Sequence, residues 1–350
     1  MYKRAILLFL GIAILAFTLY MVDFYKVLEI IATFPLRYLL ILLFIEILII
    51  IFSSIKWKVV LKEKISTAAL IPISIVGYLF TNITPIGIAG GEPVRAYLLY
   101  KIKKIPIERS FASVIVDLFL EILPIFFLAV ISIFLIIIKG IEVEIALMLV
   151  FLTFLLFFLF LISINLVINP SLSHKLIEIF IKCILYVPIL KRRAINFKSK
   201  IYDIQEKFTN AVKDSMIDFN VLLFGTIISC LKWLLVLFRV YLIAIALNIK
   251  VLFSHVLIVE TSILILSGIP LIPGSLGIWE GASVLLFSII AEISATEAAA
   301  ITLIDRSLFY LLPSIIGAIL SVHYGINILK EEEFKVEEEI KERILTNSKR

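Results

Sequence analysis

Charged side chains lie inside or beside long apolar runs of this 350-residue chain. Inserting one such charge into a bilayer costs about 2.5 to 3.5 kcal/mol, so each needs a partner or a function. Glu92 and Arg95 are three residues apart, one helical turn, where an ion pair can form. Asp117 and Glu121 are four apart and share one helix face. The candidate substrate-binding residues are Glu92, Arg95, Asp117, Glu121, Lys232, Arg239, Glu280, Asp305 and Arg306.

These nine residues comprise five carboxylates and four cations, a near-balance that indicates an internally paired network. Lys232 and Arg239 are seven residues apart on one helix face, which we expect to point inward. Asp305 and Arg306 are adjacent, so they should have different partners. Because arginine has a planar fork suited to phosphate and short helix N-termini add partial positive charge, an anionic head group is a plausible guest. A purely structural network of paired charges is the alternative.

Glycine and proline interrupt two apolar stretches near their middles. A turn inside a membrane needs glycine, and we favour this explanation over a phosphate cradle built from backbone amides. The predicted loop residues are Pro85, Gly87, Gly90, Gly91, Pro273, Gly274 and Gly277.

The composition excludes a water-soluble domain, because 62% of the residues are apolar, 17% are charged and the mean hydropathy is +1.14. The two cysteines are far apart, and none of the three histidines has a second ligand at helical spacing. The chain has no sequence resembling a nucleotide-binding loop. We therefore expect an integral membrane protein with no metal, no cofactor and no nucleic-acid partner.

Six apolar runs are long enough to cross about 30 Å of hydrocarbon. They cover residues 4–22, 37–57, 110–138, 143–168, 219–247 and 298–328. The interrupted stretches, 66–100 and 254–292, each predict two short helices around a loop. The predicted fold class is an all-α polytopic membrane protein with six full transmembrane helices and two re-entrant broken-helix hairpins.

Basic residues favour hairpins that turn back within the membrane, because cytoplasmic loops retain lysine and arginine. With both stretches re-entrant, the cytoplasmic segments hold 26 basic residues and the opposite loops hold 4. Both termini are then cytoplasmic, in a cell membrane. Glu46 and Glu260 have no partner nearby in the sequence, so we expect pairing across helices or snorkelling for them.

An offset of 188 residues superposes the two broken stretches, with Glu92 on Glu280 and Asp117 on Asp305. The offset predicts inverted repeats near 37–138 and 225–326 in one transmembrane domain, 1–330. Inverted repeats with broken helices are typical of transporters. We also predict a cytoplasmic amphipathic insert at 170–218 and a charged cytoplasmic tail at 331–350.

Three segments carry a family resemblance: TPIGIAGGEPVRAYLLYK at 84–101, IPGSLGIWEG at 272–281 and DRSLFYLLPSIIG at 305–317. They resemble the membrane region of lysylphosphatidylglycerol synthases and its free-standing archaeal and bacterial relatives, over about residues 4–330. The resemblance implies a lipid translocase fold, which in bifunctional members moves aminoacylated phosphatidylglycerol between leaflets and in relatives is suspected of handling polyprenyl phosphate lipids. It also implies that Glu92, Arg95, Glu280, Asp305 and Arg306 lie in a central cavity.

Two departures from that family limit the expectation. We expect no soluble aminoacyl-transfer domain, and therefore no synthase activity. The family's Asp-Arg pair corresponds here to Asp117-Leu118 in the first repeat, which removes one cation.

The first functional hypothesis is a flippase that moves an anionic phosphate-bearing or aminoacylated lipid head group between leaflets. Its partner would be a membrane phospholipid or a polyprenyl phosphate lipid, with Arg95, Arg239 and Arg306 at the head group. One alternative is an intramembrane lipid-modifying transferase with Glu92 or Asp117 as general base. Another is an accessory subunit of a lipid-modifying complex.

Overall fold

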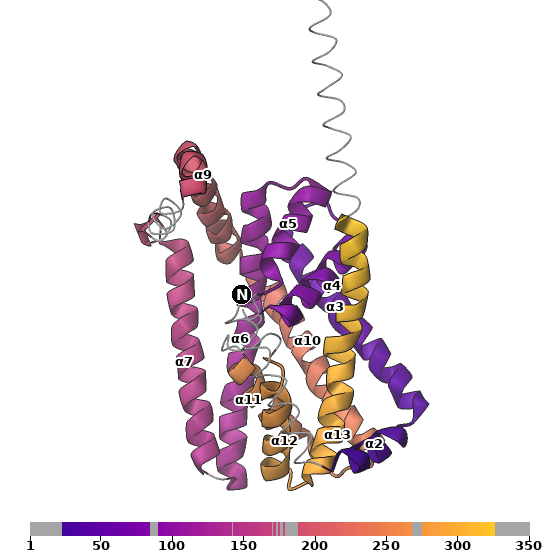
Figure 1. The fold of residues 1–350 in the computed structure, drawn as a ribbon. Helices are drawn as coiled ribbons and strands as arrows, with labels where there is room; N and C mark the ends of the chain where they lie inside the picture. The colour runs from indigo at the N-terminus through magenta and orange to yellow at the C-terminus, as the bar shows by residue number, and fades with distance from the viewer. Residues whose placement is uncertain are drawn as a thin grey trace, which may run out of the picture.

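A computed structural model describes residues 23–84, 90–141, 143–169, 188–267 and 275–325, together with five residues between 171 and 178. For residues 188–201 it describes the backbone. Every regular element in these described ranges is helical, as the predicted fold class requires (Figure 1).

Five helices are long and apolar enough to cross a membrane. Their bounds are α3 Leu36–Leu61, α6 Ile107–Lys139, α7 Val143–Ile168, α10 Phe219–Ala246 and the continuous helix Ala295–Gly325. The last begins as α13 (Ala295–Arg306) and passes through a π-helical turn, η3 (Ser307–Leu311). Five predicted spans are therefore confirmed as helices, and the predicted span 4–22 lies outside the described residues.

Four shorter helices flank the two interruptions, as the sequence predicts. They are α4 Thr67–Ile83, α5 Glu92–Lys103, α11 Phe253–Ser267 and α12 Ile278–Ile290. The pair α4 and α5 starts and finishes at the end of the bundle where α6 begins, and α11 and α12 start and finish at the opposite end (Figure 1). The predicted loop residues Pro85, Gly87, Pro273 and Gly274 lie outside the described residues.

Residue pairs at the two ends fix this arrangement. The Lys62 Nζ atom, just after α3, lies 2.6 Å from Oδ2 of Asp218, the residue that caps α10. At the other end Lys139 Nζ, on α6, lies 3.1 Å from His255 Nε2, on α11. The pair α4 and α5 therefore enters the bundle from one end, and α11 and α12 enter from the other.

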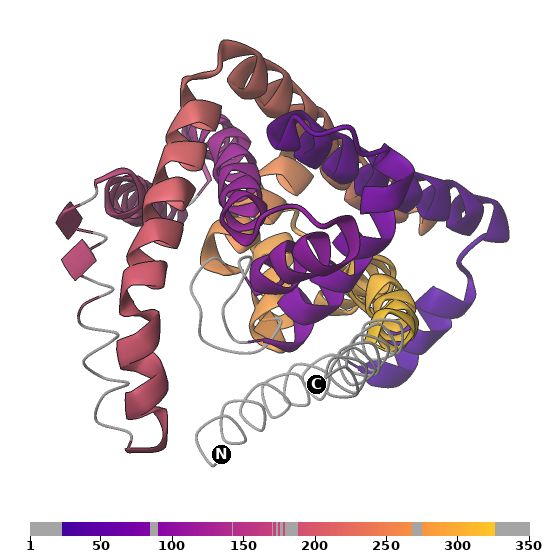
Figure 2. The same ribbon diagram turned by 90° about the horizontal axis from the view of Figure 1, so that it is seen from above.

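Two further helices lie at the periphery, α2 (Phe24–Ala32) and α9 (Pro188–Ile217). Viewed along the bundle, α9 and α7 lie on one side, and α2 and α3 lie on the other (Figure 2). Val212 and Thr209 of α9 are buried, and Val212 belongs to an apolar cluster with residues of α3, α6 and α10. The C-terminal part of α9, within the predicted insert, is thus packed on the bundle, while most of the amphipathic stretch 172–187 lies outside the described residues.

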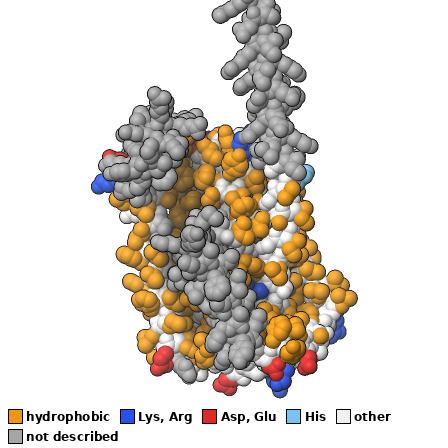
Figure 3. Space-filling view, viewed as in Figure 1, with side chains coloured by type: hydrophobic (Ala, Val, Ile, Leu, Met, Phe, Trp, Pro, Cys, Tyr) orange, Lys and Arg blue, Asp and Glu red, His pale blue; other side chains and the backbone are white. Residues whose placement is uncertain are grey.

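The outer surface is apolar, as a lipid-facing surface should be. Phe151, Phe154 and Phe158 of α7 are exposed, and side chains of this kind cover the face seen in Figure 3, with most charged side chains near its two ends. Such a large exposed apolar area marks contact with a membrane or a partner. The bundle is therefore a multi-pass membrane domain.

The interior contact between α4 and α5 depends on two glycines. A Cβ atom at Gly91 would lie 2.1 Å from the carbonyl oxygen of Gly77, and one at Gly77 would lie 2.6 Å from Cγ and Cδ of Arg95. Gly91 has ordinary helical dihedral angles, so close approach and not backbone freedom explains it. Gly90 is similar, because its Cβ would meet Thr84 Oγ1 at 1.9 Å. Close packing between α4 and α5 is therefore sufficient to explain why Gly90 and Gly91 are glycine.

Replacing Gly91 with alanine should lower the free energy of unfolding by about 1–3 kcal/mol or more, because a methyl group must displace backbone. Thermal unfolding of the purified protein in detergent would measure this. Gly325→Ala is the matched control, since nothing lies within 4 Å of its added Cβ. Equal melting temperatures for the two variants would show that α4 and α5 are not in close contact.

Candidate substrate cavity

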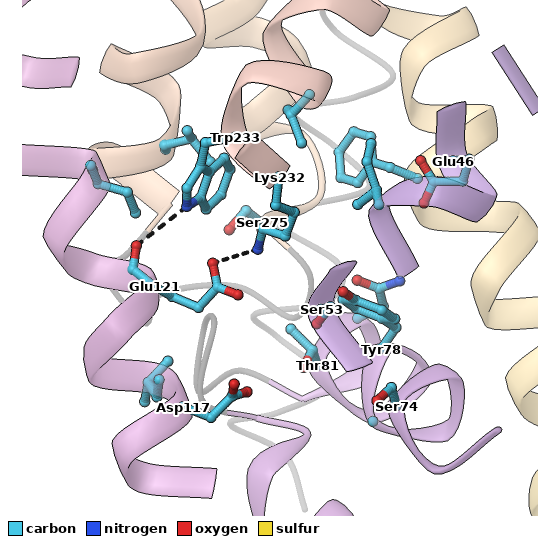
Figure 4. Close-up of a pocket in the computed structure, with 18 of the residues that line it drawn as sticks. Glu46, Ser53, Ser74, Tyr78, Thr81, Asp117, Glu121, Lys232, Trp233 and Ser275 are labelled. Carbon is cyan, nitrogen blue, oxygen red and sulfur yellow. Dashed lines mark hydrogen bonds and ion pairs between the residues drawn. The ribbon is translucent and has the colours of Figure 1, made fainter. Parts of the chain in front are cut away.

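A central cavity of about 230 Å³ lies where the two broken-helix pairs approach the long helices (Figure 4). Charged side chains from α3, α5, α6, α10, α11 and α13 reach it. Those lining it are Glu46, Glu92, Arg95, Asp117, Glu121, Lys232, Arg239, Glu260 and Arg306. Its polar neutral lining includes Ser53, Ser74, Tyr78, Thr81, Asn82 and Ser275.

Arg95 is the centre of the first charge cluster. It lies one turn into α5, and its Nη1 donates to Glu92 Oε1 and Oε2 at 3.0 and 2.9 Å and to Asp117 Oδ2 at 2.9 Å. The predicted pairing of Glu92 with Arg95 is confirmed. Its guanidinium stacks on Trp57, 4.2 Å from the ring centroid, and the Trp57 Nε1 donates to Ser113. The ring and the two carboxylates hold Arg95 in one position.

Lys56 extends this cluster across α3 and α6. It is fully buried, and its Nζ lies 3.1 Å from Asp117 Oδ1, 2.9 Å from the Asp117 carbonyl oxygen and in contact with Glu121. Lys232, from α10, pairs with the other oxygen of Glu121 (Figure 4). Trp233 Nε1 donates to the Glu121 carbonyl oxygen at 3.3 Å. Alternating charges thus link α5, α6, α3 and α10.

The second cluster centres on two arginines. Arg239 of α10 donates to Glu46 Oε2 at 2.5 Å and to Asp305 Oδ1 at 2.7 Å. Arg306 donates through Nε to Glu280 Oε1 at 2.7 Å. Asp305 and Arg306 therefore have different partners, as predicted from their adjacency.

Glu280 also caps a helix, because its Oε2 accepts a hydrogen bond from the Gly277 N–H at 2.7 Å. Gly277 has φ of +79°, a conformation that favours glycine, at the start of α12. Tyr310 and Phe309 lie against the Arg306 guanidinium, with ring centroids at 4.2 and 5.2 Å. The position of Arg306 is therefore fixed by α12 and by the π-helical turn.

The structure brings all nine predicted site residues together. Seven line the cavity, whereas Glu280 and Asp305 bind the arginines that line it. Among the described residues, no three His, Cys, Asp or Glu side chains are placed to hold a metal ion. The arrangement can therefore offer charge and hydrogen bonds to a polar group.

Sequence reasoning missed Lys56 and gave Glu46 and Glu260 no site role. Lys56 falls inside the predicted span 37–57, yet it was counted among the 26 basic residues of the cytoplasmic segments; it lies within α3, which continues to Leu61. The missed signal was helical spacing, since Lys56 continues the buried stripe of Ile49, Ser53 and Val60. Glu46 pairs across helices with Arg239, one of the outcomes expected for it.

Fold and cavity together define a multi-pass α-helical membrane protein with a buried charged chamber. The chain belongs to the family of the lysylphosphatidylglycerol synthase TM region, whose profile matches residues 4–317. Two UPF0104 membrane proteins of Methanothermobacter thermautotrophicus are 26% and 27% identical to it, covering 92% and 93% of this chain and 94% and 97% of theirs.

A UPF0104 membrane protein of Methanocaldococcus jannaschii is 25% identical over 91% of this chain and 94% of its own length. These relatives are free-standing, as the resemblance of the three sequence segments implied. No solved structure matches the chain.

Replacing Lys56 with methionine should lower the free energy of unfolding by about 3–5 kcal/mol, because two carboxylates lose a buried cation. Melting temperature in detergent, with circular dichroism as a check of helix content, would measure it. Arg109→Met is the control, since its ion pair with Glu63 is exposed and should contribute little. An unchanged melting temperature in the Lys56 variant would show that the first cluster does not stabilise the fold.

Proposed function

We propose that this protein is a lipid flippase whose cavity binds a phosphate-bearing head group while the lipid tails stay in the bilayer. The observation that carries the proposal is the state of Arg95. Its side chain is 8% exposed, and its Nε and Nη2 atoms have no hydrogen-bond partner. A buried, unpaired donor costs about 1–3 kcal/mol, more when it is charged. Oxygens of a bound anion would satisfy both donors.

The geometry of the guanidinium supports phosphate as that anion. Nη1 is occupied by Glu92 and Asp117, which leaves the Nε edge and Nη2 of the planar fork for a ligand. Two parallel N–H groups match two phosphate oxygens. Gly77 leaves room for the stem of Arg95, so the arginine reaches the cavity.

The arrangement of broken helices supports movement of the ligand between leaflets. The two pairs enter from opposite ends and leave polar groups near the middle of the bundle, the architecture expected of a site that opens alternately to either side. We propose that they belong to inverted repeats, 37–138 and 225–326, of a single domain spanning 1–330, with the insert 170–218 and the tail 331–350 cytoplasmic. In this proposal both termini face the cytoplasm of a cell membrane.

The family supports a lipid as the carrier of the phosphate. The matched family is named after the membrane region of an enzyme that synthesises a phospholipid, lysylphosphatidylglycerol. This chain also covers almost the full length of its UPF0104 relatives. The apolar side chains of the outer surface can contact the lipid tails while the head group occupies the cavity. A phospholipid or a polyprenyl phosphate lipid fits both observations, with Arg239 and Arg306 as further cations for the head group.

Flipping can be measured in liposomes that contain a fluorescent phosphatidylglycerol or a fluorescent polyprenyl phosphate, by quenching of the probe in the outer leaflet. Arg95→Gln should slow flipping about ten- to a hundredfold, since charged hydrogen bonds contribute about 1.5–3 kcal/mol. Arg306→Ala should abolish flipping. Arg95→Lys should remain slow, because lysine keeps the charge and loses the fork.

The control for this series is Lys26→Gln, an exposed residue paired with Asp23 outside the cavity, which should flip lipid at the wild-type rate. Gel filtration and melting temperature identify variants that do not fold. Wild-type rates in folded Arg95→Gln protein would overturn the assignment. A covalently altered lipid found by mass spectrometry would instead favour the transferase.

A further inference from the structure

Glu260 is a buried carboxylate that the mechanism above does not use. It lies on α11, is 2% exposed and lines the cavity. Its Oε2 atom has no hydrogen-bond partner, and no described lysine or arginine nitrogen lies within salt-bridge distance of it. Every other buried carboxylate of the two clusters is paired with a cation. Glu260 is therefore the exception among them.

The charged groups nearest Glu260 do not compensate for it. Arg239 of α10 is engaged by Glu46 of α3 and Asp305 of α13. Its positive charge is therefore shared by two carboxylates that it already binds. Glu280 of α12 is already bound to Arg306 and the Gly277 N–H.

The other described helices packed against α11 bring no compensating charge. Between Glu121 and Lys139, α6 has no titratable residue, and Lys139 contacts His255 at the far end of α11. On α7, Glu144 is exposed, and no titratable residue follows it in that helix. Lys232 of α10 is paired with Glu121. Glu260 thus has one neighbouring cation among the described residues, Arg239, which two other carboxylates already bind.

Counting the charges of both clusters also indicates an excess of negative charge around the cavity. In the described residues, five cations face seven carboxylates. The cations are Lys56, Arg95, Lys232, Arg239 and Arg306, and the carboxylates are Glu46, Glu92, Asp117, Glu121, Glu260, Glu280 and Asp305. Two uncompensated negative charges in a low-dielectric interior are unfavourable. A proton, or a cationic group of the substrate, must reduce that charge.

We infer that Glu260 is the proton-binding site of the cavity: it holds one proton in the arrangement described here and exchanges that proton with water that enters the cavity. This inference rests on the proposed flippase function and deepens it by naming the coupling ion. The step is the binding of one proton to a carboxylate, which gives a neutral carboxylic acid. Release toward one side and uptake from the other couple head-group movement to a proton gradient.

Infrared spectroscopy of the full chain in lipid nanodiscs tests the protonation state without any transport. At neutral pH the wild-type protein should show a carbonyl stretching band of a protonated carboxylic acid that shifts in deuterated water. Glu260→Gln should lose this band, because the amide is nearly isosteric and carries no titratable proton.

Glu46→Gln is the matched control, because Glu46 lines the same cavity and is paired with Arg239. It should retain the band. Absence of the band from the wild-type protein would overturn the inference, and so would its loss in Glu46→Gln with retention in Glu260→Gln. Neither result bears on whether the protein flips lipid, so the two proposals fail separately.

Liposomes that contain fluorescent phosphatidylglycerol test the coupling. A pH gradient imposed across the wild-type liposomes should change the flipping rate, and the ratio of rates with and without the gradient should fall to one in Glu260→Gln. A wild-type ratio in that variant would overturn the role of Glu260. If the band is absent and a primary-amine lipid suppresses labelling of Glu260 by a carbodiimide, a cationic substrate group occupies the position instead of a proton.

Discussion

Neutralisation of buried charge is the constraint on which the structure depends. An ion placed in hydrocarbon is so costly that helices carrying one must bring it to a partner. Glu121 receives Lys56 from α3 and Lys232 from α10, so one carboxylate on α6 ties three spans together. Arg239 does the same for α3, α10 and α13 through Glu46 and Asp305. Helix packing around the cavity is therefore set by electrostatics as much as by apolar contact.

Local backbone features set where the cations lie. The close contact of Gly91 with Gly77 brings α5 against α4, and Arg95 passes beside Gly77 to the cavity. On the other side, Glu280 uses one oxygen to cap α12 and the other to hold Arg306. The π-helical turn begins directly after Arg306 and contains Phe309 and Tyr310, whose rings contact it. Such turns occur frequently at functional sites.

Prediction from sequence succeeded where the information was local. Apolar length predicted the five described spans, and the three-residue spacing predicted the Glu92 and Arg95 pair. Partners across helices could not be predicted, because nothing in the spacing relates Lys56 to Asp117 or Glu46 to Arg239. Lys56 was missed because a lysine near the end of an apolar run is ordinarily a loop residue, whereas here its long stem reaches an acidic partner inside.

The 188-residue offset relates carboxylates near the two broken stretches but not the cations that bind them. Glu92 and Asp117 correspond to Glu280 and Asp305, whereas Ser283 stands where Arg95 would be expected and Leu118 where Arg306 would be. Each glutamate nevertheless pairs with an arginine, Glu92 with Arg95 of the same helix and Glu280 with Arg306 of α13. The carboxylates therefore recur at the offset, whereas the arginines that bind them do not. In the proposed flippase, a head group would therefore meet a different arrangement of donors on each side, and the two directions of movement need not be equivalent.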